Sequence, residues 1–304
     1  MTPKPPDLHL TPFWHDQIGP APALCERPPA AVDVLVVGSG YTGLNAAIAT
    51  ARGGRSTLVV DTEDPGFGCS TRNGGQISTS VKPSLDKLTA KFGERQARAI
   101  RETGAEALEW IADFVTREKL DCDFRRVGRY HAAHTPQHYE SLVRDAATMR
   151  VHEGIESFAV PRSEQRKELG TDAYFGGVVY PRHSSLHPAK YHRGLLNLAL
   201  GAGVQVVGHC AVQRIEKTGT GFKVLTRKGE ITASDVIVAT NGYTTDLTPW
   251  LQRRVIPIGS YIIATEELPE AMIDSLFPTD RIASDTCKVI YYYRASPDRR
   301  RVLF

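Results

Sequence analysis

The sequence AVDVLVVGSGYTGLNAAIATARGGRSTLVVD, residues 31–61, decides the fold class. Its β-branched run Val32–Val37 is typical of a strand that is buried on both faces of a parallel sheet. A glycine-rich turn, a small-residue helix over 44–52 and a second strand over 57–61 follow. This order predicts a βαβ unit with a right-handed crossover.

The turn between strand and helix, Gly38-Ser39-Gly40-Tyr41-Thr42-Gly43, fits the G-x-G-x-x-G dinucleotide fingerprint. Gly38 permits the tight turn, Gly40 lets the backbone approach a pyrophosphate, and Gly43 lets helix and strand pack closely. The helix N-terminus offers free N–H groups to phosphates. Asp61, at the end of the second strand, can accept hydrogen bonds from ribose hydroxyls, which argues against NADP. An ordinary glycine-rich turn is the competing interpretation.

Residues 66–77, GFGCSTRNGGQI, form a second glycine-rich segment. Glycines let a backbone pass close to a flat ligand. Ser70 and Asn73 can hydrogen-bond phosphate or ring heteroatoms, and Arg72 can neutralise a phosphate. A flexible surface loop would have a similar composition.

A third segment, residues 235–243, is a buried strand that runs into the small-residue turn Ala239-Thr240-Asn241-Gly242. Such a turn admits close approach of a cofactor to the backbone. A plain strand end fits it as well.

Together these segments resemble the D-amino-acid-oxidase-like FAD-dependent oxidoreductases, and residues 66–77 with Leu186–Lys190 are most similar to the γ-glutamylputrescine oxidase branch. The resemblance extends from about residue 13 to residue 304. It implies an α/β fold in which a Rossmann-like FAD-binding domain is interleaved with an α+β substrate domain on a mainly antiparallel sheet. It divides the chain after residue 31 into an FAD-binding domain (32–90 and 188–250) and a substrate domain (91–187 and 251–304). The proline-rich, irregular residues 1–31 predict a leader segment that lies on the surface.

The resemblance also implies site residues. Arg72 and Asn73 are expected to face the flavin, and Gly74-Gly75 to pass beside its ring system. Ser70 is expected to contact the pyrophosphate or ribityl chain. The catalytic residue is not assigned; Tyr261, Tyr291 and Tyr292 are candidates for the pocket, although Tyr291–Tyr293 also fit the alternating faces of a strand. The full set of expected FAD-binding residues is Gly38, Gly40, Tyr41, Thr42, Gly43, Asp61, Ser70, Arg72, Asn73, Gly74, Gly75, Gln76, Val212, Thr240, Asn241 and Gly242.

The activity implied is FAD-dependent oxidation of an amine or amino acid to an imine, with oxygen reoxidising the flavin to give hydrogen peroxide. An NAD-dependent dehydrogenase and a non-catalytic truncated fragment remain alternatives. Members of the family run on past residue 304. The resemblance therefore implies a C-terminally truncated chain whose last hairpin, 291–304, exposes an unpaired edge.

Composition narrows the function classes further. The chain has 304 residues, 41% of them apolar, which excludes disorder as the main state. A net charge of +3 gives no reason to expect a nucleic-acid partner. Five cysteines without a C-x-x-C, no secretory signal in residues 1–12 and no apolar window of about 18 residues predict a cytoplasmic protein without membrane spans.

Histidines gather at 131–138 and at 183–192, but neither group has a cysteine partner or an H-E-x-x-H, so we expect ordinary surface or loop histidines and no metal. Periodicity completes the prediction of elements. It predicts helices over 93–120, 136–152 and 190–200, and strands over 124–133, 174–180, 204–216, 221–227, 230–239, 255–265 and 288–294.

Overall fold

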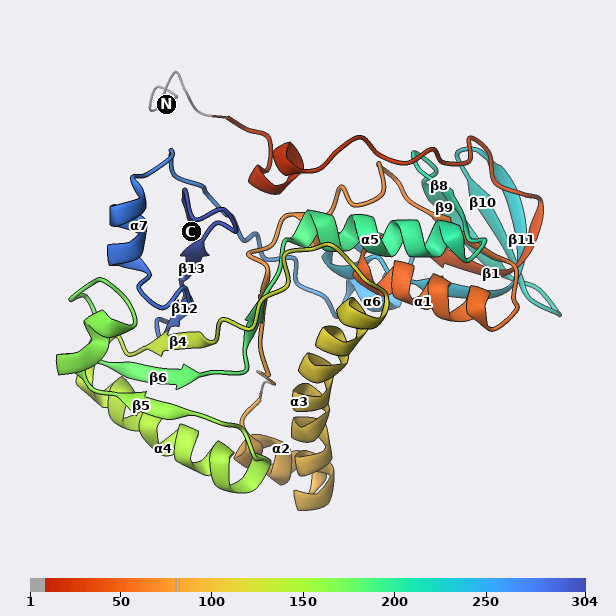
Figure 1. Ribbon diagram of the computed structural model, residues 1–304. Coiled ribbons are helices and arrows are strands. Elements are labelled where there is room, and N and C mark those ends of the chain that lie inside the picture. The colour runs from red at the N-terminus through yellow and green to blue at the C-terminus, as the bar shows by residue number, and fades with distance from the viewer. Residues whose placement is uncertain (1–8, 80, 82) are drawn as a thin grey trace, which may run out of the picture. The chain divides into compact units, whose positions relative to one another are not determined.

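The computed structural model describes residues 9–79, 81 and 83–304 (Figure 1). Residues 1–8, which carry most of the stretch assessed for a secretory signal, lie outside the described residues. The chain divides into two compact units: unit 1 runs to Asn73 and resumes over Pro188–Tyr261, and unit 2 comprises Gly74–His187 and Ile262–Phe304. The first boundary lies earlier than residue 90 because residues 76–77 pair with residues 184–185 of unit 2.

Unit 1 is built on a six-stranded sheet with the order β8-β2-β1-β11-β10-β9. Its first four strands in that order run parallel, and β10 and β9 are antiparallel. The βαβ prediction is confirmed. The strands are β1 (Ala31–Val37), β2 (Thr57–Val60), β8 (Gln205–Val207), β9 (Val212–Lys217), β10 (Phe222–Thr226) and β11 (Gly229–Val238).

Strand β1 lies in the middle of this sheet and is buried on both faces. Leu35 and Val37 enter a core cluster with Leu58 and Val60 of β2. The alternate residue Val36 points to the other face of the sheet, toward α1. A Cβ built on Gly43 of that helix would lie 3.3 Å from the Val36 Cγ1. Burial on both faces explains why the sequence there is a continuous apolar run and not an alternating one.

Two helices, α1 (Tyr41–Arg52) and α5 (Pro188–Gly201), lie side by side against this sheet (Figure 1). Helix α1 packs on β1 and β2, and α5 packs on β8. Gly53 ends α1 by donating its N–H to Ala49 O. The short helices of the unit are η1 (Phe13–Gln17), η2 (Cys69–Thr71), η4 (Asn241–Tyr243) and α6 (Pro249–Gln252).

Unit 2 contains a second six-stranded sheet with the order β14-β13-β12-β4-β6-β5. Every neighbouring pair is antiparallel except β4 and β12, which confirms the mainly antiparallel sheet. A two-stranded ribbon joins β3 (Gln76–Ile77) to β7 (Ser184–Ser185). The six strands are β4 (Arg129–Ala132), β5 (Phe158–Val160), β6 (Gly177–Tyr180), β12 (Ile282–Asp285), β13 (Tyr292–Ala295) and β14 (Val302–Leu303).

Helix α4 shows how its sequence sets its ends. The Thr135 hydroxyl accepts the N–H of His138, Pro136 starts the helix, and Gly154 ends it at φ +65°. The other helices of unit 2 are α2 (Leu85–Phe92), α3 (Glu94–Arg117), α4 (Pro136–Glu153), η3 (Arg162–Lys167) and α7 (Glu270–Leu276).

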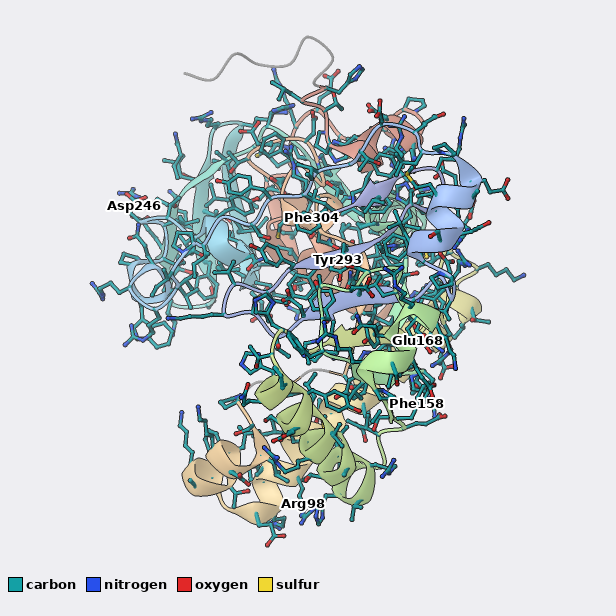
Figure 2. All side chains as sticks on the ribbon, turned by 90° about the vertical axis from the view of Figure 1, so that its left-hand side faces the viewer. Arg98, Phe158, Glu168, Asp246, Tyr293 and Phe304 are labelled. Atoms are coloured by element: carbon teal, nitrogen blue, oxygen red, sulfur yellow. The ribbon has the colours of Figure 1, made fainter. Side chains whose placement is uncertain are left out.

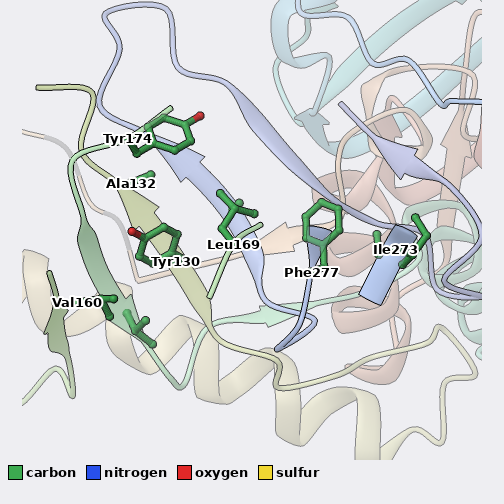
Figure 3. Packing of buried hydrophobic residues seen from close by; sticks show 10 residues of the cluster. Tyr130, Ala132, Val160, Leu169, Tyr174, Ile273 and Phe277 are labelled. Carbon is green, nitrogen blue, oxygen red and sulfur yellow. The ribbon is translucent and has the colours of Figure 1, made fainter. Parts of the chain in front are cut away.

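The two faces of this sheet carry different cores. One face buries Tyr130 and Ala132 of β4 against Leu169, Ile273 and Phe277 (Figure 3). The opposite face buries alternate residues of β6, Val178 and Tyr180, under Leu142 and Ala146 of α4. The period-2 alternation of the strands produces this division.

The prediction of a strand over 255–265 is wrong. In that segment only Ala264 makes a bridge, to Leu303. Residues 255–261 contain Pro257, which cannot donate to a sheet, and Gly259, which weakens a strand. Helix α7 and strand β12 were not predicted.

The final hairpin forms as the sequence predicts, but the expectation that its edge is unpaired is wrong. Strand β14 pairs with β13 on one side. On its other side Thr265 donates to Val302 O at 3.0 Å, and Ile263 and Phe304 exchange both backbone hydrogen bonds. Phe304 also stacks on Tyr293, with ring centroids 5.9 Å apart (Figure 2). Leu303 is consequently buried.

No helix among the described residues is long and apolar enough to cross a membrane.

Gly43 is the position of unit 1 least able to accept a side chain, since an added Cβ would fall 1.9 Å from the backbone oxygen of Gly38. We expect Gly43→Ala to lower the free energy of unfolding in urea by at least about 1 kcal/mol, because backbone must move. The matched control is Gly201→Ala in α5, where nothing lies within 4 Å of an added Cβ. Equal stability of the two variants would contradict the assigned packing.

Candidate active site

The turn between β1 and α1 requires its glycines for steric reasons. Gly38 has φ +104°, and a Cβ there would lie 2.6 Å from Ala239 O. Gly43 is needed because α1 passes directly over Gly38. Gly40 is the N-cap of α1 and has no side chain to cap it, so the first-turn amides of Thr42 and Gly43 face no cap from the N-cap residue and can serve a ligand.

Asp61 is tied to this turn by hydrogen bonds. Its Oδ2 accepts from the Ser39 amide at 2.8 Å and from the Ser39 hydroxyl at 2.5 Å, and its Oδ1 accepts from the Glu63 amide at 3.2 Å. A carboxylate has about four lone-pair sites, so one stays available for a ribose hydroxyl. Sequence reasoning missed Ser39, which is fully buried between the two glycines.

The glycine-rich segment after β2 reaches the same turn. The Ser70 hydroxyl accepts the Tyr41 amide at 3.1 Å and would lie 2.9 Å from a Cβ on Gly40. Arg72 donates to Phe67 O at 2.6 Å, and its guanidinium carbon stands 4.5 Å from the centroid of the Phe67 ring. Ser70 therefore lies at the N-terminus of α1, as a phosphate-contacting residue must.

Asn73 closes this segment on itself by donating to Ser70 O at 3.1 Å. Its own carbonyl accepts the indole N–H of Trp14 at 2.8 Å. Trp14 is completely buried, and His15 beside it bonds the Thr71 hydroxyl at 2.7 Å. The expectation that the leader lies only on the surface is therefore wrong for η1, which packs against α5. A tryptophan in a proline-rich stretch was the available signal.

The turn after β11 lies beside the glycine-rich segment. Asn241, at φ +49°, donates to the Cys69 thiol at 3.2 Å. The Thr240 and Thr244 hydroxyls bond one another at 2.8 Å. A Cβ on Gly242 would meet nothing within 4 Å, so this glycine leaves an open backbone surface.

Two further predicted residues lie at the margins of this arrangement. Thr42 is exposed in the first turn of α1. Val212 begins β9 and packs partly buried against the core of unit 1. It follows Cys210, whose amide donates to Asp61 O at 2.7 Å. Thr42 therefore lies at the helix N-terminus, and Val212 lies two residues after the residue that bonds Asp61.

His192 is the main residue that sequence reasoning missed. It lies on α5, 3% exposed, and its Nε2 bonds the carbonyl of Ser39 at 2.7 Å. A Cβ on Gly66 would fall 2.6 Å from the His192 ring. Burial lowers the pKa of His192 below its ordinary value. His183 and His187 are also buried, so neither is a surface histidine, although both lie in loop segments next to β7.

Three predicted residues belong to unit 2. Gly74 has no neighbour within 4 Å of an added Cβ, whereas Gly75 adopts φ +66° and accepts the Leu186 amide at 2.9 Å. The Gln76 side chain donates to Ala283 O and Tyr293 O, at 3.3 Å each. Gln76 therefore holds the β3 ribbon to the six-stranded sheet of unit 2.

None of the three candidate pocket tyrosines is buried within its own unit. Tyr261 is 92% exposed, and Tyr291 and Tyr292 are about half exposed. Tyr293 packs against the core, and its hydroxyl donates to that of Tyr174 at 2.9 Å. Tyr292 and Tyr293 therefore lie on alternating faces of β13, and a pocket role for Tyr261, Tyr291 and Tyr292 stays a prediction.

A cavity of about 500 Å³ lies beside α3 in unit 2, and none of the predicted site residues lines it. Leu108 and Trp110 contribute to its wall together with His183. His183 bonds the Thr79 hydroxyl at 3.0 Å, and burial lowers its pKa to about 3. No sequence motif marked this region.

The residues of unit 1 thus gather at the carboxyl ends of β1, β2 and β11. In open α/β sheets a dinucleotide binds at that edge, with its phosphates at a helix N-terminus. Such a ligand requires glycine backbone that it can approach, amides that can bind its phosphates, and a carboxylate that can accept its ribose hydroxyls.

Comparison with known proteins agrees with this arrangement. A family model described as "FAD dependent oxidoreductase" (DAO) matches residues 33–304. The gamma-glutamylputrescine oxidoreductase of Escherichia coli is 33% identical over 276 residues, and a probable oxidoreductase OrdL of Haemophilus influenzae is 30% identical over 275 residues. Each alignment covers 88% of this chain and 63% of the relative, so the chain spans less than two thirds of their length.

Solved structures share the fold at low identity. Glycine oxidase from Geobacillus kaustophilus superimposes with a TM-score of 0.68 at 18% identity, covering 90% of this chain and 71% of that one. L-proline dehydrogenase from P. horikoshii gives a TM-score of 0.70 at 14% identity, covering 91% and 70%.

The buried His192 makes the stability of unit 1 depend on pH. Its pKa is below 6.5 in the folded chain, so the unfolded chain binds more protons below that pH, and stability is lost as the pH falls. We expect the free energy of unfolding in urea to drop from pH 7 to pH 5. The drop should be smaller in His192→Gln, which keeps an N–H donor and does not titrate.

His183 acts with the same sign, so the test compares wild type with His192→Gln and does not rest on the absolute slope. The matched control is His152→Gln, which replaces an exposed histidine of α4. Parallel pH profiles for wild type and His192→Gln would show that His192 is not titrating on unfolding.

Proposed function

Because the chain belongs to the DAO family of FAD-dependent oxidoreductases, we propose that it binds FAD in unit 1 and serves the oxidation of an amine or amino acid. The observation that carries the proposal is the convergence of the α1 N-terminus, the Ser39–Asp61 pair and the Ser70 hydroxyl on one bare backbone surface at Gly40.

The residues present suit an adenine dinucleotide. The first-turn amides of α1 would bind the pyrophosphate, and Gly40 would let it approach. Ser70 would exchange its bond with the Tyr41 amide for one to a phosphate oxygen, since a hydroxyl can also donate. Asp61 would accept from the ribose through its remaining lone pair. His192 would hold the turn in place through Ser39 O.

The two remaining segments would serve the flavin end of the cofactor. Asn241 and Cys69 bond one another, and Gly242 leaves space beside them. Arg72 and Asn73 lie in the same segment as Cys69 and carry the polar groups expected to face the flavin. Gly74–Gln76, in unit 2, belong to the proposed flavin-facing set through the family resemblance.

When bound, FAD would supply the two-electron acceptor for a hydride from the carbon beside the amine nitrogen. The protein's part is to orient that carbon and to desolvate the amine, because only the neutral amine can release hydride and burial lowers an amine pKa. The proposed net reaction converts amine and oxygen to imine and hydrogen peroxide, and water then hydrolyses the imine.

The names of the relatives support this substrate class and no finer one. The relatives named above include one that acts on gamma-glutamylputrescine, and the structural neighbours include a glycine oxidase and an L-proline dehydrogenase. All five cysteines are free, which supports a reducing, cytoplasmic setting for the proposed reaction.

Asp61 tests the cofactor site. We expect Asp61→Asn to weaken FAD binding by about 10-fold, or about 1.4 kcal/mol, because the neutral amide is a poorer acceptor for a ribose hydroxyl. Quenching of flavin fluorescence in a titration of the apoprotein gives the Kd. Asp64→Asn, an exposed aspartate of the same segment, is the control and should bind as wild type does. Unchanged affinity in Asp61→Asn, with thermal unfolding unaltered, would remove Asp61 from the site.

The reaction is tested on the purified chain supplied with FAD. We expect absorbance near ~450 nm from bound flavin, bleaching under anaerobic conditions with an amine or amino acid, and peroxide when oxygen is admitted. Binding of NAD without flavin would favour the dehydrogenase alternative. Bound flavin that no amine or amino acid bleaches would contradict catalysis by this chain and leave a flavin-binding protein.

A further inference from the structure

Strands β4 and β12 are the one parallel pair of the unit 2 sheet, with Asp285 opposite Ala132. Parallel strands end at the same edge, so the residues that follow them meet there. His134 comes two residues after Ala132, and Cys287 comes two residues after Asp285. An imidazole nitrogen of His134, a carboxylate oxygen of Asp285 and the sulfur of Cys287 all lie within 4.8 Å of one another.

We propose that His134, Asp285 and Cys287 form a binding site for Zn²⁺. Thiolate, imidazole and carboxylate are the ligand types that zinc takes in proteins, and three of them leave a fourth position for water or another ligand. Magnesium and calcium prefer sets made of oxygen atoms, so the thiol and the imidazole disfavour them. The proposal is independent of the proposed flavin function, because all three residues belong to unit 2 and none is assigned to FAD.

The loop that carries Cys287 is held to β4 by Thr286. The Thr286 amide donates to Ala132 O at 3.1 Å, and the Thr286 hydroxyl accepts the amide of His134 at 2.9 Å. The same hydroxyl bonds His138 Nδ1 at 2.8 Å. The backbone around two of the three proposed ligands is therefore ordered before any metal binds, which lowers the entropy cost of binding.

Asp285 is the second observation that favours a cation. The residue is 1% exposed, and its Oδ1 accepts the amides of Cys287 and Tyr291 at 3.1 Å each. Among the described residues no lysine or arginine forms an ion pair with it. A buried carboxylate is costly unless a cation or hydrogen bonds compensate it. The two amides supply hydrogen bonds, and a divalent ion would add a cation.

The geometry needs only a small adjustment. Zinc bonds of about 2.0–2.3 Å in a tetrahedron place ligand atoms roughly 3.5 Å apart. The separation of up to 4.8 Å therefore has to close by about 1 Å, and His134 is exposed, with room for its ring to move. His131 and His138, the neighbours in sequence, instead bond Ser284 and Thr286 and would support the site from outside.

Titration with Co²⁺, a spectroscopic substitute for Zn²⁺, tests the site. We use the full chain after dialysis against a chelator under reducing conditions. The expected result is uptake of one equivalent, a thiolate-to-cobalt charge-transfer band, visible bands of a four-coordinate ion, and displacement by Zn²⁺ but not by Mg²⁺. Cys287→Ser and His134→Ala should each weaken cobalt binding by about 10-fold or more and remove or alter the bands.

Matched controls separate this site from chance binding elsewhere. Cys25→Ser removes an exposed free thiol and His152→Ala an exposed histidine, and both should titrate as wild type does. Thermal unfolding of each variant checks that it is folded, and Zn²⁺ should raise the melting temperature of wild type but not of Cys287→Ser. Absence of cobalt uptake, or equal affinity and spectra in wild type and Cys287→Ser, would overturn the proposal.

Discussion

Unit 1 depends on one backbone contact, the passage of α1 over the carbonyl of Gly38. No side chain fits there, since even a single carbon on Gly43 would overlap that oxygen. The contact sets where α1 begins and so directs its first amides toward the edge of the sheet. It also leaves Ser39 facing inward, where Asp61 and His192 hold its amide, hydroxyl and carbonyl. The candidate site follows from a close approach of two pieces of backbone.

The sequence was sufficient where a signal is local. The apolar run of β1, the glycines after it and Asp61 lie within 31 residues, and each has a distinct steric or electrostatic purpose. The helix over 136–153 was equally readable, since Thr135, Pro136 and Gly154 mark its ends. Fold class and the glycine turn could therefore be predicted without any structure.

What could not be predicted depends on contacts between distant residues. His192 is 153 positions from Ser39, and nothing in its neighbourhood distinguishes it from an exposed histidine. The same is true of Trp14, whose partner Asn73 lies 59 positions away. The proximity of His134 to Asp285 and Cys287 could not be predicted either, because it arises from the pairing of β4 with β12. The 92% exposure of Tyr261 could not be predicted either, because it depends on the tertiary fold.

The interleaving of the two units has a consequence for the ribosome-bound chain. Ala31 in β1 pairs with Thr232 in β11, and the turn at Gly38 rests on Ala239, so the two sides of the central sheet are made about 200 residues apart. At 5–20 residues per second, roughly 10–40 s separate their emergence. During that interval β1 can pair with β2 and pack against α1. The backbone N–H and C=O groups on its other edge, which later pair with β11, have no partner, and the valines of β1 are only partly buried. The topology therefore requires that this edge be protected during synthesis, by a chaperone or by transient non-native pairing. Mutations that stabilise only the finished protein would not protect it.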